Sequence, residues 1–252
     1  MSAYKSKLVE HYDSLFAPKD YKGEAALIYR LCGGPIQIQK ILDIGCGTGS
    51  HLPHLLLNAS QQITGIDISR EMIDKAKEKN LSSQINFIHG EVQSLKGNKF
   101  DLAISMFNVI NHLDSIQELK LFFKSVRECL YKNSKFIFDC WNGVAALREE
   151  PRSNQRIIES AVGGHFILKQ TPQTNLLTGH VEIENQVDVY YLEERVDSFT
   201  YTLDHWLWTP SVLSELLAQS GFIVEGIYKH NLTEIESAVA DDFKVIFMAT
   251  AI

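Results

Sequence analysis

Three glycines that follow a short apolar run are the first residues whose spacing suggests chemistry. In residues 39–51, QKILDIGCGTGSH, Gly45, Gly47 and Gly49 come directly after an apolar segment. A strand, a glycine turn and a helix in succession place main-chain N–H groups at the carboxyl edge of a sheet, where open α/β sheets bind ligands. The segment therefore predicts a cofactor-binding loop.

The residues around the loop limit the class of ligand that it could bind. The nicotinamide loop has the spacing G-x-G-x-x-G, and here Ser50 stands where its third glycine would be. Asp43 precedes the loop, and a carboxylate there would repel a pyrophosphate but attract a cation. Asp67 ends the next apolar run and can accept hydrogen bonds from both ribose hydroxyls. A ligand with a ribose, a positive centre and no phosphate fits these demands, and S-adenosylmethionine is such a ligand.

Alternating strands and helices would position these residues. Helical spacing of apolar residues covers 4–16 and 22–33. Apolar runs then predict five strands, at 41–44, 63–68, 85–88, 100–106 and 135–139. Helices are expected at 50–57, from Ser69 onward, and at 114–130 with Asp114 or Ser115 as its N-cap. This alternation predicts a parallel sheet with helices on both faces.

The pattern changes after Trp141. Residues 155–208 contain long alternating segments rich in Val, Tyr and Thr, which predict an antiparallel β insertion. A helix capped by Thr209 and ended by Gly221 follows, with two further strands at 222–229 and 243–250. We therefore expect an α/β fold with a cofactor-binding part at 1–140, an insertion at 141–208 and a closing part at 209–252. The insertion would be a substrate lid or the face of a homodimer.

Four segments of the chain resemble those of the class I S-adenosylmethionine-dependent methyltransferases. The matching segments are ILDIGCGTGSHL, ITGIDISREMIDKAKEK, INFIHGEVQSL and KFDLAISMFNVINHL, in that family's order. The resemblance implies a doubly wound, mostly parallel, Rossmann-like sheet of seven strands. It also implies cofactor contacts from Asp43, Gly45, Cys46 and Gly47 at the methionine end, Asp67 at the ribose, Ile68, Met72, Glu91 and Val92 around the adenine, and Met106 closing the pocket.

A narrower resemblance concerns the acceptor. The segments EHYDSLF, KDYKGEAA and MFNVINHL are similar to those of N-methyltransferases that act on nucleotide-linked amino sugars. By position, this resemblance implies that Tyr12 and His112 are catalytic residues facing the acceptor, with Tyr21 and Glu24 near the same opening. That group has a Glu-Pro-Trp-Trp run after strand five, where this chain has DCWN, so Asp139 and Trp141 are assigned to the acceptor with its identity left open.

The roles of the acceptor residues follow from the chemistry of methyl transfer. An in-line displacement needs alignment above all, and an amine needs only to be neutral, whereas a sugar hydroxyl needs a positioned base. His112 could serve in either case, because imidazole titrates near about 6.5. The alternatives are that His112 caps the helix near Asp114 and that Tyr12 is plain packing.

Aromatic side chains of the insertion are a second set of acceptor candidates. His205 is a candidate contact to the acceptor. The aromatic residues of the insertion could stack on a sugar or base, or they could form strand core or a dimer face. They are Trp206, Trp208, Tyr190, Tyr191 and Tyr201.

Composition excludes several classes of function. The 252 residues are 45% hydrophobic and 22% charged with a net charge of −7, and no basic cluster is present, which argues against nucleic acid or a membrane surface as partner. The four cysteines show no metal or disulfide spacing, so no metal is expected. We expect a cytoplasmic enzyme acting on a small molecule. A hydroxyl or phosphoramidate acceptor and a non-catalytic cofactor-binding subunit are the alternatives.

Overall fold

The computed structural model describes residues 6–34, 38–80, 82–160 and 163–252. The main sheet consists of β1 (Lys40–Ile44), β2 (Gln62–Asp67), β3 (Ile85–His89), β4 (Phe100–Ser105), β5 (Leu130–Trp141), β10 (Phe222–Lys229) and β11 (Lys244–Ala251). Its strand order is β10-β11-β5-β4-β1-β2-β3. β11 runs antiparallel to both of its neighbours, and the other pairs are parallel. The predicted seven-stranded, doubly wound sheet is confirmed.

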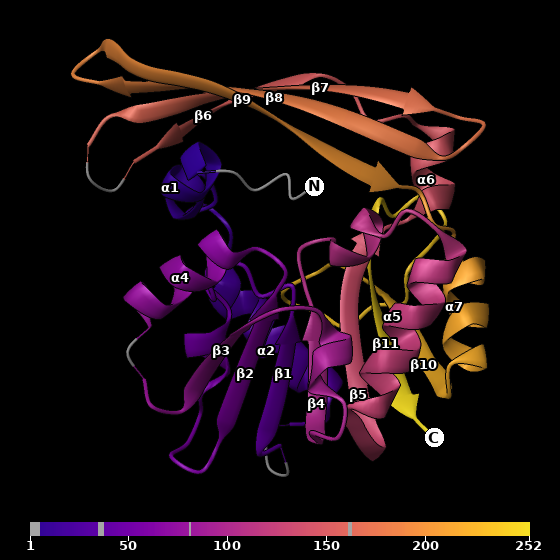
Figure 1. Ribbon diagram of the computed structural model, residues 1–252. Coiled ribbons are helices and arrows are strands. Elements are labelled where there is room, and N and C mark those ends of the chain that lie inside the picture. Colours follow the sequence, from indigo (N-terminus) through magenta and orange to yellow (C-terminus); the bar gives the residue numbers. More distant parts are fainter. Residues whose placement is uncertain (1–5, 35–37, 81, 161–162) are drawn as a thin grey trace.

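Helices cover both faces of this sheet (Figure 1). On one face, α2 (Tyr21–Leu31), α3 (Leu52–Leu55) and α4 (Arg70–Lys79) contribute apolar side chains to a shared core cluster. On the other face, α5 (Ile116–Glu128) and α7 (Pro210–Gln219) pack over a core rich in phenylalanine. Two single-turn helices, η1 (Val92–Leu95) and η2 (Val109–His112), follow β3 and β4. The carboxyl edge of the parallel strands is thereby left for the site.

The helix starts follow the predicted caps. The hydroxyls of Ser69, Ser115 and Thr209 accept hydrogen bonds from the main chain three residues later, at 3.3, 3.2 and 3.4 Å. α1 (Ser6–Leu15) is described from Ser6, so residues 4 and 5 of the predicted first helix lie outside the described residues. The helix predicted at 50–57 is wrong in length, because the N–H groups of Leu57 and Asn58 donate to the Gln61 side chain instead of continuing it.

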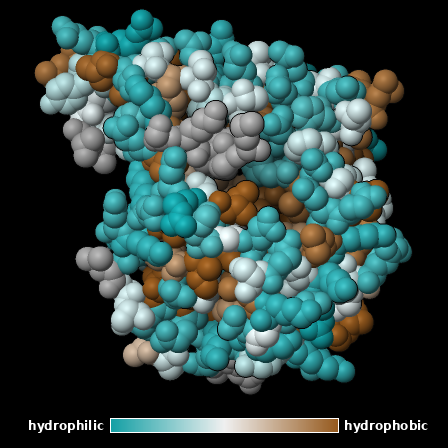
Figure 2. Space-filling view, viewed as in Figure 1, coloured by the Kyte–Doolittle hydropathy of each residue, from teal (hydrophilic) through white to brown (hydrophobic). Residues whose placement is uncertain are grey.

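A second sheet lies across the carboxyl edge of the main sheet (Figure 1). It is antiparallel, in the order β6 (Asn154–Glu159), β7 (His165–Asn175), β8 (His180–Tyr191) and β9 (Glu194–Trp206), as the alternation predicted. One apolar cluster joins it to α1 and to Met72 of α4. Another joins it to Trp141 and to α6 (Gly143–Arg148), a short helix that the sequence analysis missed. Between these two attachments the visible face is hollowed (Figure 2).

Within the described part of the chain, no helix combines the length and the apolar character that crossing a membrane requires.

Candidate active site

The glycine loop is hydrogen-bonded and closely packed at Gly45, whereas there is free space beside Gly47. The N–H groups of Gly45 and Cys46 both donate to the Ile66 carbonyl, at 2.8 and 3.1 Å. Gly45 has φ +72°, and a Cβ there would lie 2.5 Å from the Val109 side chain, so only glycine fits. Gly47 has φ +53°, and a Cβ there would meet no atom within 4 Å. The loop therefore offers free space at Gly47.

Asp67 stands beside that space at the end of β2. Its carboxylate accepts from the N–H of Gly47 and from the N–H of Ser69, each at 2.8 Å. Burial raises the pKa of Asp67, and these two hydrogen bonds lower it in part. A carboxylate has about four acceptor positions, so two remain for a ligand after the two main-chain bonds. This arrangement suits a pair of vicinal hydroxyls.

Asp43 is buried directly ahead of the loop, with 1% of its surface exposed. Its Oδ2 atom has no hydrogen-bond partner among the described residues. Burial raises the pKa of Asp43 to about 7; His51 lowers it and the charge of Asp67 raises it further. Because an unpartnered buried carboxylate is costly, this position would be stabilised by a nearby cation.

A small cavity brings together predicted residues from three separate segments of the chain. Its lining includes Tyr12, Tyr21, Gly45, Cys46, Gly47 and Met106, all six of which the sequence analysis assigned to the site. It also includes four residues that were missed, Thr48, Ser50, His51 and Phe107. Two acceptor candidates, Tyr12 and Tyr21, therefore share one opening with the glycine loop. The other acceptor candidates are not among its lining residues, namely His112, Glu24, Asp139, Trp141 and His205.

Thr48 ties the glycine loop to the two helices beside it. Its hydroxyl donates to the Asp13 carboxylate of α1 at 2.6 Å. Lys79 of α4 reaches the same carboxylate at 2.8 Å and the Ser50 hydroxyl at 2.9 Å. α1 is thus fixed against the glycine loop, which explains how Tyr12 comes to line the cavity.

Glu24 lies in an ion network beside the cavity. Its carboxylate accepts from Nε2 of His51 at 2.6 Å and from Nε2 of His230 at 3.0 Å, and it is also paired with Lys19. Burial raises the pKa of Glu24, but the hydrogen bonds from His230 and His51 and the charge of Lys19 outweigh it and hold the pKa well below its usual range. The carboxylate of Glu24 is surrounded by these three side chains, and its predicted contact with the acceptor stays a prediction.

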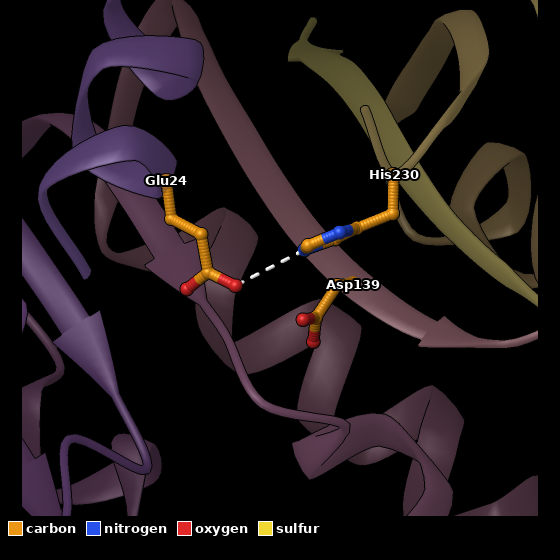
Figure 3. Close-up of side chains that lie close together, drawn as sticks. All are labelled: Glu24, Asp139 and His230. Atoms are coloured by element: carbon orange, nitrogen blue, oxygen red, sulfur yellow. Dashed lines mark hydrogen bonds and ion pairs between the residues drawn. The ribbon is translucent and has the colours of Figure 1, made fainter. Parts of the chain in front are cut away.

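Asp139 forms the adjoining part of this network (Figure 3). Its carboxylate accepts from the Asn108 N–H at 2.6 Å and pairs with Lys244 at 2.7 Å. Ligand atoms of Glu24, Asp139 and His230 lie within 4.8 Å of one another, a spacing that could hold a metal ion and that the sequence did not indicate. Lys19 and Lys244 already supply a cation to each carboxylate, so the network is neutralised without a metal.

His112 is the predicted residue that connects the main domain to the second sheet. Its Nδ1 lies 2.9 Å from the carbonyl oxygen of Asp204 in β9. A carbonyl only accepts, so Nδ1 carries the hydrogen, and in the neutral ring the lone pair is on Nε2. Burial lowers the pKa of His112, while the bond to Asp204 partly raises it. A neutral imidazole with a basic Nε2 is thus the stable form.

The predicted acceptor residues His205 and Trp141 lie beside this histidine, with the His205 ring tilted by 42° to the His112 ring. The His205 ring lies 4.6 Å from the His112 ring and, nearly parallel, 4.6 Å from the Trp141 ring. His205 is 4% exposed, and burial together with the nearby His112 lowers its pKa well below the usual range. His205 is therefore a neutral spacer between Trp141 and His112.

The remaining predicted residues are spread around the loop. Ile68 is 64% exposed beside Asp67, as a residue flanking a planar ligand would be. Glu91 is exposed, whereas the Val92 side chain is buried in the core on the α5 face. Met72 is 2% exposed, in the cluster with Tyr12 beneath the second sheet.

The tyrosines and tryptophans of the insertion do not gather at one place. Trp208 donates to the Leu113 carbonyl at 3.0 Å, and Trp206 packs on His180. Tyr190 stacks on His165, while Tyr191 is 51% exposed. Tyr201 lies next to Phe199, on the cluster that faces α1. The predicted aromatic set is therefore not a single stacking surface.

Residues 41–133 match the family model described as a methyltransferase domain. This segment is a methyltransferase domain. It holds the glycine loop, Asp67 and His112, and its family accounts for the order in which these residues occur. The match begins at β1 and ends within β5, so the N-terminal helices and the second sheet lie outside it.

Similar proteins extend the comparison. A protein of Methanocaldococcus jannaschii with no characterised function is 35% identical over 141 residues, which is 55% of this chain and 51% of that protein. The dTDP-3-amino-3,6-dideoxy-alpha-D-glucopyranose N,N-dimethyltransferase of Streptomyces fradiae is 31% identical over 121 residues, 46% of each chain. The chain thus spans about half the length of the curated relatives it matches. The fold resembles Streptomyces venezuelae DesVI, with a TM-score of 0.80 and 19% identity, covering 99% and 100% of the two chains.

The residues around the glycine loop fit S-adenosylmethionine as cofactor of the methyltransferase domain. The free space at Gly47 admits a ligand against the main chain, and Asp67 has acceptor positions for a ribose. The unpartnered oxygen of Asp43 suits a ligand that carries positive charge. A phosphate-bearing ligand would meet two carboxylates at this loop, which would repel it.

Proposed function

We propose that this protein is an S-adenosylmethionine-dependent methyltransferase that methylates the amino group of a nucleotide-linked amino sugar. The observation that carries the proposal is the pairing, in a methyltransferase domain, of an unpartnered buried Asp43 with Asp67 held by Gly47 and Ser69. The acceptor class is supported by the name of the Streptomyces fradiae relative and by the segments around Tyr12 and His112.

When bound, S-adenosylmethionine supplies a methyl group on a sulfonium. The acceptor nitrogen would take this methyl group, and the electron pair of the broken carbon–sulfur bond would stay with sulfur, which would leave S-adenosylhomocysteine. The methylated ammonium then loses a proton, and Nε2 of His112 is the group that we propose accepts it. Tyr12 and Tyr21 line the opening through which the acceptor nitrogen would approach.

The carboxylates assigned to the acceptor take another role in this proposal. Glu24 holds His51, which lines the cavity, and Asp139 holds the main chain at Asn108. Phe107 and Asn108 have φ of +73° and +62°, a left-handed pair that Asp139 stabilises through its bond to Asn108. Glu24 and Asp139 are thus positioning residues. The insertion 141–208, through its second sheet, would act as the lid over the acceptor.

A hydroxyl acceptor is the second candidate, and one observation favours it. The neutral His112 ring, with its lone pair on Nε2, is the kind of base that a sugar hydroxyl requires and an amine does not. The position of the new methyl group on the product, on nitrogen or on oxygen, separates the two candidates.

The test combines cofactor binding with an acceptor panel. We expect calorimetry to detect S-adenosylmethionine binding, and methyl-labelled cofactor to transfer its label to an amino sugar linked to dTDP. Binding without transfer to any nucleotide amino sugar or nucleotide sugar hydroxyl would reject the enzymatic proposal. Transfer only to sugars without an amino group would select the second candidate.

A further inference from the structure

A polar row crosses the apolar inner face of the second sheet. On the face turned toward the main domain, Leu168, Ile183 and Val187 belong to the apolar clusters that attach the sheet. Side chains alternate along a strand, so residues two positions away point to the same face. By this rule Gln170, Asn185 and Tyr201 face inward, and the strand register places them side by side, with Asn154 opposite Gln170.

The row lies between the two attachments of the sheet. On one side are Leu168, Val187 and Phe199, which pack toward α1, and on the other are Pro172, Ile183 and Leu203, toward Trp141 and α6. A polar row in the middle of an apolar face costs stability unless its groups are hydrogen-bonded. Its position above the carboxyl edge of the main sheet indicates that it serves a ligand.

The amides of the row hold one another in place. Asn185 is 0% exposed; its Oδ1 accepts from Nε2 of Gln170 at 2.8 Å, and its Nδ2 donates to the Ile183 carbonyl at 2.9 Å. Oε1 of Gln170 accepts from Arg156 at 3.1 Å. Gln170 is partly exposed and keeps a second amide hydrogen and a second lone pair, whereas the fully buried Asn185 holds Gln170 in place. The row is therefore preorganised and retains both donors and acceptors.

Tyr201 adds a hydroxyl to the row. Burial raises the pKa of Tyr201 to about 12, while the charge of Arg156 lowers it in part, so the phenol stays protonated at neutral pH. No described residue takes part in a hydrogen bond with this hydroxyl. It can donate one bond and accept another.

A cavity of about 370 Å³ adjoins one end of the row. It is bordered by Asn154 and Gln170 of the row, by Trp141 and Phe243, and by Glu149 and Glu150. The Trp141 and Phe243 rings are inclined by 56°, so they form an angled wall rather than a parallel slot for a planar base. Arg152 pairs with Glu149 at 3.1 Å, which leaves Glu150 as surplus negative charge that would repel a phosphate.

We propose that this row and cavity form a carbohydrate subsite, in which the row binds the hydroxyls of a pyranose. Sugar hydroxyls both donate and accept, as the Gln170 amide and the Tyr201 phenol do. Trp141 borders this cavity, and the His205 ring lies between Trp141 and His112, the proposed base. The subsite is therefore separated from the proposed base by the His205 ring. The proposal rests on the proposed function and specifies which part of the acceptor the second sheet binds.

The test measures binding rather than turnover. Calorimetry with dTDP-3-amino-3,6-dideoxy-α-D-glucopyranose and with dTDP alone, both in the presence of S-adenosylhomocysteine, isolates the contribution of the sugar. We expect Gln170→Leu and Tyr201→Phe each to weaken binding of the sugar nucleotide about five- to tenfold, the effect of one lost hydrogen bond. Binding of dTDP should not change. The matched control is Gln173→Leu, the same change on the outer face of the same strand.

Several results would overturn the subsite. These are a wild-type protein that binds the sugar nucleotide no more tightly than dTDP, variants that behave like Gln173→Leu, and an equal loss for dTDP, which would mean that the row binds the nucleotide. Tyr201→Phe keeps the ring, so it tests the hydroxyl even if Gln170→Leu disturbs folding. If the wild-type protein transfers the methyl group but Gln170→Leu and Tyr201→Phe bind the sugar nucleotide as tightly as the wild type, the subsite is rejected and the proposed function is not. Weakened binding without any methyl transfer would reject the proposed function alone.

Discussion

His112 is bonded through Nδ1 to the carbonyl oxygen of Asp204, 2.9 Å away on the second sheet. The bond fixes the hydrogen on Nδ1 and so determines which nitrogen of the ring is basic. It also makes the proposed base part of the contact between the two sheets, together with the neighbouring bond from Asn111 to the Trp206 carbonyl. The position of the second sheet and the protonation of His112 are thereby coupled.

Replacing His112 tests its role as proton acceptor. We expect His112→Ala to lower kcat by one to two orders of magnitude, at the lower end of general-base effects because an amine can release its proton to water. Cofactor affinity should stay within about twofold. Because burial lowers the pKa of His112, the kcat of the wild type should decrease with falling pH only below about pH 6.5. This decrease should be absent in the variant. Full activity in the variant would make His112 a structural residue.

Asp67→Ala should weaken S-adenosylmethionine binding about a hundredfold or more. The change removes two charge-assisted bonds that shape the loop as well as the proposed ribose contacts. Asp101→Ala is the matched control, because Asp101 also accepts two main-chain N–H groups, those of Gln39 and Lys40, at the amino end of β1. Calorimetry compares the two, and equal affinities would mean that the ribose lies elsewhere.

Asp43 gives the cofactor site a pH dependence. Its pKa is about 7 without ligand, and a bound cation would lower it, so affinity for S-adenosylmethionine should decrease as pH falls below about 7. Asp43→Asn should bind more weakly at pH 8 and show a flatter profile. The Tm of the variant minus that of the wild type should be larger at pH 8 than at pH 5. Burial destabilises the ionised carboxylate of the wild type, which is present at pH 8, and the neutral amide avoids this cost. A wild-type affinity independent of pH between 5 and 8 would contradict this role.

Glu24→Gln should destabilise the fold at neutral pH by about 2–4 kcal/mol, because it leaves Lys19 without its buried partner. The pKa of Glu24 is lowered in the folded state, so its stabilisation is present above the unfolded pKa and is lost as pH falls below it. The difference in unfolding free energy between wild type and variant should therefore shrink toward pH 3. Urea unfolding at pH 7 and pH 3 measures it, and a constant difference would exclude the ionised carboxylate as its cause.

Local patterns were sufficient to predict the strands, most of the helices and the glycine loop, whereas the seven-stranded sheet was predicted from the family resemblance. Strand and helix periodicity, the caps Ser69, Ser115 and Thr209, and the spacing of Asp43 and Asp67 all act over short stretches. The ion network could not be predicted, since Glu24 and His230 are 206 positions apart and meet where the segment after β10 packs against α2. The polar row required the register of four strands, and periodicity does not give register.

Product analysis of one reaction tests the central claim most directly. The protein is incubated with S-adenosylmethionine and dTDP-3-amino-3,6-dideoxy-α-D-glucopyranose, and the sugar is examined by mass spectrometry and NMR. We predict a sugar nucleotide that carries at least one methyl group on the amino nitrogen, with matching release of S-adenosylhomocysteine, and no such product from Asp67→Ala at the same cofactor concentration. An unmodified sugar with bound cofactor, or a methyl group on oxygen, would contradict N-methylation of an amino sugar.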